Sequence, residues 1–71
     1  MTSIATRNTV LRSIVRGVEV SVHSDNAWTY VTADSADEAR VAAILRAFAY
    51  RPQVTRIRGR AVFAVPAEQI A

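Results

Sequence analysis

The sequence has no cysteine, no lysine, one histidine and only two glycines. The absence of cysteine excludes disulfides and thiolate zinc sites, and it agrees with a reducing compartment. One histidine is too few for a structural metal site. Two glycines are too few for the glycine-rich loops that hold phosphate groups. We therefore expect neither a metal nor a small-molecule cofactor.

Long apolar runs are also missing. Arg7, Arg12 and Arg16 interrupt every apolar stretch near the amino terminus, so the pattern does not predict an export signal. The apolar run from Val41 to Leu45 is far shorter than the roughly 20 residues that cross a membrane. The sequence predicts a cytoplasmic protein with no membrane partner.

The chain of 71 residues predicts one small domain over residues 1–71. A chain of this size buries only about 60% of the surface that it exposes when unfolded. Association with another chain would add stability, and a hydrophobic content of 51% is compatible with it. An economical core that suffices alone is the alternative.

One long helix is predicted over about residues 35–50. Ser35 and Glu38 have the spacing of a capping box, and Pro52 ends the segment. Four apolar residues recur on one helical face, namely Val41, Ile44, Leu45 and Phe48. We expect this stripe to pack inward.

Two β-hairpins flank that helix. Alternating residues and the turn sequence "SDN" predict strands at about 18–23 and 28–33. Gly59 lies between two β-rich runs and predicts a second hairpin at about 53–58 and 60–65. A three-residue loop at 58–60 would pair Ile57 with Ala61 and place Arg56 on the opposite face.

The first hairpin also contains two aromatic residues on one side of a strand. Trp28 and Tyr30 alternate along the returning strand, and we expect them to face the core. If they were exposed instead, they would be residue types typical of interface hot spots.

Residues 8–16 are open to two interpretations. Their apolar residues have helical spacing, with Asn8 as a cap and Gly17 as the end. Their β-branched residues favour a strand instead. We favour a short helix, which gives the order α-β-β-α-β-β. The predicted fold is α+β: a four-stranded antiparallel sheet of two hairpins, with the long helix packed on one face.

No catalytic constellation is evident. Glu19, Ser21 and His23 share one strand face, but alternate residues on a strand are about 6.6 Å apart and project in parallel. A nucleophile and its base must approach within about 3.2 Å. The acidic residues near 34–38 are explained by helix capping. We expect that the chain is not an enzyme.

The charges are divided along the chain. All charged residues from 19 to 38 are acidic, and all those from 39 to 67 are arginines. The segment "RPQVTRIRGR", residues 51–60, suggests a nucleic-acid contact through Arg51, Arg56, Arg58 and Arg60. The modest net charge of +3 and the lack of outward aromatics in this segment argue against that hypothesis. We favour a solvated hairpin tip as the explanation of these arginines, and contact with a protein partner is a third alternative.

The predicted helix also has an unusually uncharged outer face. Small residues there would let another surface approach closely, and we select Ala43, Arg46, Ala47 and Tyr50 as a protein interface. Alanine-rich composition is the alternative explanation. The leading hypothesis is a small non-catalytic binding module of accessory or regulatory, possible phage-type, character. It would self-associate as a homodimer and dock on a protein partner, and nucleic-acid binding is the alternative.

Overall fold

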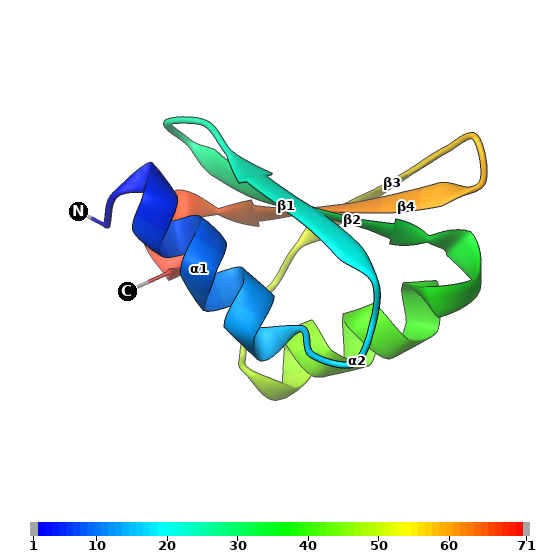
Figure 1. Ribbon diagram of the computed structural model, residues 1–71. Helices are drawn as coiled ribbons and strands as arrows, with labels where there is room; N and C mark the ends of the chain where they lie inside the picture. Colours follow the sequence, from blue (N-terminus) through cyan, green and yellow to red (C-terminus); the bar gives the residue numbers. More distant parts are fainter. Residues whose placement is uncertain (1, 71) are drawn as a thin grey trace.

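The computed structural model describes residues 2–70 and confirms the α+β prediction (Figure 1). The helices are α1 (Ile4–Ile14) and α2 (Glu38–Ala47), with short 3₁₀ turns at Ser35–Asp37 and Ala67–Gln69. The strands are β1 (Val20–Ser24), β2 (Trp28–Asp34), β3 (Gln53–Ile57) and β4 (Arg60–Pro66). They form one antiparallel sheet in the order β1-β2-β4-β3.

The molecule has two layers. Both helices lie on the same side of the sheet, and no helix of residues 2–70 covers the other side (Figure 1). Helix α1 packs beneath β1 and β2, and α2 packs beneath β2. The largest fully buried side chains lie between the layers: Phe63, Leu11, Leu45, Val31, Val41, Val65 and Thr29. We call the uncovered side of the sheet the open face.

Residues 8–16 are largely helical, as favoured, but the helix begins earlier than predicted. Ser3 is the N-cap, and its hydroxyl accepts a hydrogen bond from the backbone N–H of Thr6 at 3.1 Å. Asn8 therefore lies inside the helix and is not its cap. Gly17 follows the helix with a φ of 79°, a left-handed conformation that glycine adopts without strain.

The predicted helix at 35–50 is a 3₁₀ turn followed by α2. The predicted capping box does not form: the Asp34 carboxylate caps the 3₁₀ turn by accepting the N–H of Ala36 at 2.9 Å, and Asp37, the N-cap of α2, forms no side-chain cap bond. The helix ends before Phe48, and Ala49 reverses the chain with a φ of 66°. As a result Phe48 is 56% exposed, whereas Tyr50 packs against the core. The expected positions of these two aromatic residues were both wrong.

The register of the second hairpin differs from the prediction by one residue. Ile57 pairs with Arg60, so the turn contains only Arg58 and Gly59. Both have a positive φ, 49° and 75°, as a type I′ turn requires. Arg56 consequently pairs with Ala61 on the helix side of the sheet, and Ile57 lies on the open face.

The first hairpin forms close to the predicted place. The Asp25 carboxylate accepts the N–H groups of Ala27 at 2.9 Å and Trp28 at 2.8 Å, which is the local bonding expected of an aspartate in a turn. The core side of β2 is occupied by Thr29, Val31 and Ala33. Trp28 and Tyr30 alternate with them and lie on the open face, so the expectation that they face the core was wrong.

Candidate functional site

The open face of the sheet is built from alternate residues of four strands. Paired residues of antiparallel strands share a face, so the register assigns the members directly. They are Ser21 and His23 from β1, Trp28, Tyr30 and Thr32 from β2, Val62, Ala64 and Pro66 from β4, and Gln53, Thr55 and Ile57 from β3. Charged residues of this face, Asp34 and Arg60, pair at one end of it. Apart from that pair, the two central strands, β2 and β4, place aromatic and aliphatic residues on this face with one polar exception, Thr32. The outer strands contribute the polar residues Ser21, Gln53 and Thr55.

An aromatic pair stands on this face. The rings of His23 and Tyr30 are stacked, with centroids 4.9 Å apart and an interplanar angle of 25°. The Tyr30 hydroxyl donates a hydrogen bond to the Asp25 carboxylate at 2.8 Å. This bond, followed by the two backbone N–H groups at the turn, lowers the pKa of Asp25 below its ordinary 3.8. The same bond raises the pKa of Tyr30 above its ordinary 10.0 and joins the phenol to the turn.

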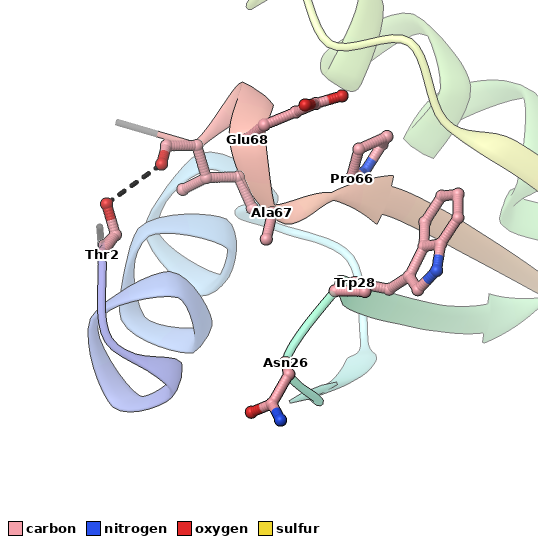
Figure 2. Close-up of a pocket in the computed structure, with 8 residues that line it drawn as sticks. Thr2, Asn26, Trp28, Pro66, Ala67 and Glu68 are labelled. Carbon is pink, nitrogen blue, oxygen red and sulfur yellow. Dashed lines mark hydrogen bonds between the residues drawn. The ribbon is translucent and has the colours of Figure 1, made fainter.

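A groove of about 730 Å³ adjoins the open face at the end where residues 2 and 70 meet. It is lined by Thr2, Asn26, Ala27, Trp28, Pro66, Ala67, Glu68 and Ile70 (Figure 2). Trp28 and Pro66 are cross-strand partners, and Figure 2 shows their rings side by side. The Thr2 hydroxyl donates to the Ile70 carbonyl at 3.1 Å. The groove extends the apolar surface of the open face.

The predicted helix interface is only partly assembled. Ala43, Arg46 and Ala47 are exposed on α2. Tyr50 lies beyond the end of α2, is half-buried, and packs against the core. The exposed aromatic residue next to α2 is Phe48.

The four predicted nucleic-acid-binding arginines do not have the same environment. Arg51, Arg58 and Arg60 are exposed and form no ion pair within residues 2–70. Arg56 instead donates through Nε to Glu38 Oε1 at 2.8 Å and through Nη2 to Glu38 Oε2. This bidentate bond raises the pKa of Arg56 and joins β3 to the start of α2.

Sequence reasoning missed the structural role of Arg7. This side chain is only 2% exposed. Its guanidinium donates to the Asp25 carbonyl at 2.6 Å, the Trp28 carbonyl at 3.2 Å and the Thr29 hydroxyl at 3.1 Å. It thereby fixes α1 to the turn that positions the aromatic pair. Its spacing of four residues from buried Leu11 was a signal that could have placed it on the inner face.

Comparisons with known proteins give no relative from which a role could be inferred. No protein-family model matches this sequence, and no curated protein or solved structure matches it. Neither α1 nor α2, the α-helices found in residues 2–70, is long and apolar enough to span a bilayer. The function must therefore be argued from the surfaces of this chain.

Proposed function

We propose that this chain is a small non-catalytic binding module that docks on a protein partner through the open face of its sheet. One observation carries the proposal: the side of the sheet without helices is aromatic and aliphatic at its centre. Contiguous apolar surface of this kind is typical of protein interaction sites.

The residue types on the open face support a protein as the partner. An antiparallel sheet with one solvated face ordinarily alternates apolar and polar residues. Here β2 departs from that pattern, because Trp28 and Tyr30 lie on the open face while Thr29 is fully buried. Tryptophan and tyrosine combine a large apolar area with a polar tip, and both are enriched in hot spots.

Self-association through α2 is a separate part of the proposal. The exposed Ala43 and Ala47 would let a second copy approach the helix closely, with Arg46 beside them. An Ala43→Glu variant should shift the chain towards monomer in sedimentation velocity. A wild-type chain that sediments as a monomer at high concentration would show that it does not self-associate.

Nucleic acid is the second candidate partner, favoured by the three exposed arginines Arg51, Arg58 and Arg60. The pairing of Arg56 with Glu38 reduces the positive charge available for phosphates. Nucleic-acid binding would weaken by about 0.9 log units per log unit of salt for each phosphate neutralised. Replacing the three arginines with serine should flatten that slope.

Affinity purification from the native host, with and without nuclease, tests the choice between partners. We expect one protein to be retained after nuclease treatment, and to be lost with a Trp28→Ser variant. Ile4→Ser is the matched control, because Ile4 is an apolar residue 42% exposed on α1 and away from the open face. If the Trp28→Ser variant retained the partner protein as well as the wild-type chain does, docking through the open face would be contradicted. Loss of all partners with nuclease would favour nucleic acid.

A further inference from the structure

Strand β3 forms one edge of the sheet, and half of its main-chain groups point away from β4. Ile57 and Arg60 flank the two-residue turn and therefore form a hydrogen-bonded pair. Hydrogen-bonded and non-bonded pairs alternate along an antiparallel ladder. The N–H and C=O groups of Val54 and Arg56 consequently face outward from the sheet.

The opposite edge, β1, is not open in the same way. Helix α1 packs beneath β1, and the Arg12 guanidinium donates to the Val22 carbonyl at 3.3 Å. No side chain of residues 2–70 forms a hydrogen bond with the main chain of β3. An edge with free main-chain groups is a template for another strand. Within the described chain, β3 is therefore the edge strand whose outward N–H and C=O groups form no hydrogen bond with an arginine side chain.

Apolar side chains stand on both sides of this edge. All five residues of β3 are exposed. Val54 is 38% exposed on the helix side, although its partner on β4, Phe63, is fully buried. Ile57 is 53% exposed on the open face. A strand added to β3 would cover both side chains while it satisfied the outward main-chain groups.

The charges around β3 indicate which strand would fit. Arg51 and Arg58 are exposed just beyond its two ends, whereas Arg60 on β4 is the cross-strand partner of Asp34. The acid paired near this edge, Glu38, is already bound to Arg56. Antiparallel pairing of β3 with β3 of a second copy would bring Arg51 of one copy near Arg58 of the other, and like charges in such positions repel. An acidic segment would be attracted by the same arginines.

We propose that the edge of β3 binds an extended acidic segment of a partner protein as a fifth strand of the sheet. This inference rests on the proposed protein-docking function and names the edge and the chemistry of the partner. Main-chain hydrogen bonds would supply affinity, and contacts to Val54, Ile57 and the arginines would supply selectivity.

A labelled peptide in which glutamate alternates with valine provides the first test. It should bind the intact chain, and amide chemical-shift changes should centre on residues 53–57. The same peptide with lysine for each glutamate should bind at least about tenfold more weakly, because the charge complementarity is reversed. Absence of binding by the glutamate peptide, equal binding of both peptides, or shift changes centred elsewhere would overturn the inference.

Two variants at one position separate main-chain from side-chain binding. Val54→Pro removes an outward N–H without removing a bond to β4, since proline is tolerated at such edge positions. We expect about fivefold weaker binding of the glutamate peptide, which corresponds to one lost hydrogen bond. Val54→Ala keeps the N–H and serves as the matched control. Circular dichroism and urea unfolding verify that both variants fold, and equal binding by a folded Val54→Pro variant would overturn strand addition.

Partner capture distinguishes this inference from the proposed function. Loss of the host partner with Trp28→Ser but full retention with Val54→Pro would contradict the edge proposal alone. Full retention with Trp28→Ser but loss with Val54→Pro would contradict open-face docking alone. A third outcome is that the glutamate peptide does not bind and that the wild-type chain self-associates but the Val54→Pro variant does not. This outcome would show that β3 pairs with β3 of a second copy and would contradict the proposal of an acidic partner segment.

Discussion

The two edges of the sheet use arginine in opposite ways. On the β1 side of the sheet, the buried Arg7 bonds the hairpin turn and β2, and Arg12 bonds a carbonyl of β1, so both belong to the fold. At the β3 edge, Arg56 pairs with Glu38 at the surface, and Arg51 and Arg58 remain exposed. Arginines therefore bond the β1 side to the rest of the fold at two positions, whereas at β3 only Arg56 is bonded and Arg51 and Arg58 are exposed. A count of arginines in the sequence overestimates the positive charge that is available for binding.

The difference also predicts where the structure opens first. On the β1 side, Arg12 of α1 bonds the Val22 carbonyl and the buried Arg7 bonds the adjoining turn and β2, whereas β3 has neither a buried residue nor a helix packed closely on it. Regions with few buried contacts open at a lower free energy than the core. Backbone amides of β3 should exchange with solvent faster than those of β2 and β4.

The largest effect is expected from removal of the buried arginine at the β1 side. Arg7→Ala leaves the Asp25 and Trp28 carbonyls without their charged donor. The free energy of unfolding should fall by about 3 kcal/mol, as measured by urea denaturation. Arg16→Ala, at an exposed position after α1, is the control. If Arg7→Ala lowered the free energy of unfolding no more than Arg16→Ala does, the proposed contrast between the two sides of the sheet would be wrong.

A smaller effect is expected where the β1 edge is covered. Arg12→Ala frees the Val22 carbonyl and should lower the free energy of unfolding by about 1 kcal/mol. Hydrogen exchange of the β1 amides should become faster and approach that of β3. Arg46→Ala, an exposed arginine on α2, should leave both measurements unchanged. If hydrogen exchange of the β1 amides were unchanged in Arg12→Ala, the packing of α1 alone would protect this edge strand.

A substitution in the Arg58–Gly59 turn, between β3 and β4, should stabilise the protein. Arg58 has a φ of 49°, a conformation that asparagine tolerates better than arginine. Arg58→Asn should raise the free energy of unfolding by about 0.5 kcal/mol in urea denaturation. Arg60→Asn, just after the turn, should give no such gain. A decrease with Arg58→Asn would show that the Arg58 side chain contributes to the fold.

The smallest effect concerns pH and the turn of the first hairpin. The folded pKa of Asp25 lies below 3.8, so its contribution to stability is present above about pH 4 and is lost as the pH falls through the folded value. Asp25→Asn should flatten this acid dependence of the urea midpoint, and Glu68→Gln should not. The pKa of Tyr30 lies above 10.0, so its contribution is present below about pH 10 and is lost as the pH rises further. An unchanged acid dependence in Asp25→Asn would contradict the role of the carboxylate.

The elements themselves could be predicted from local patterns. Alternation in the strands, turn residues at 24–26 and Gly59, and the apolar spacing of Val41 and Leu45 lead to the observed α+β fold. These signals depend on residues that are neighbours in the sequence, so the sequence alone contains them.

The errors arise where tertiary contacts select between local alternatives. The register of β3 changed because Arg58, a non-glycine residue, adopts a positive φ. Trp28 and Tyr30 face outward because the smaller residues Thr29, Val31 and Ala33 occupy the side of β2 that packs against the helices. Arg7 is buried because carbonyls from a distant turn surround it. The open face could therefore not be recognised until the sheet was assembled.

The hydrogen bond between the Thr2 hydroxyl and the Ile70 carbonyl places the two ends of the described chain together. A short peptide link between them would turn the molecule into a ring, which could then be opened at the Arg58–Gly59 turn. Such a permuted chain would start and finish at the tip of the basic hairpin. A domain or label fused to either new terminus would then lie at the end of the β3 edge of the sheet.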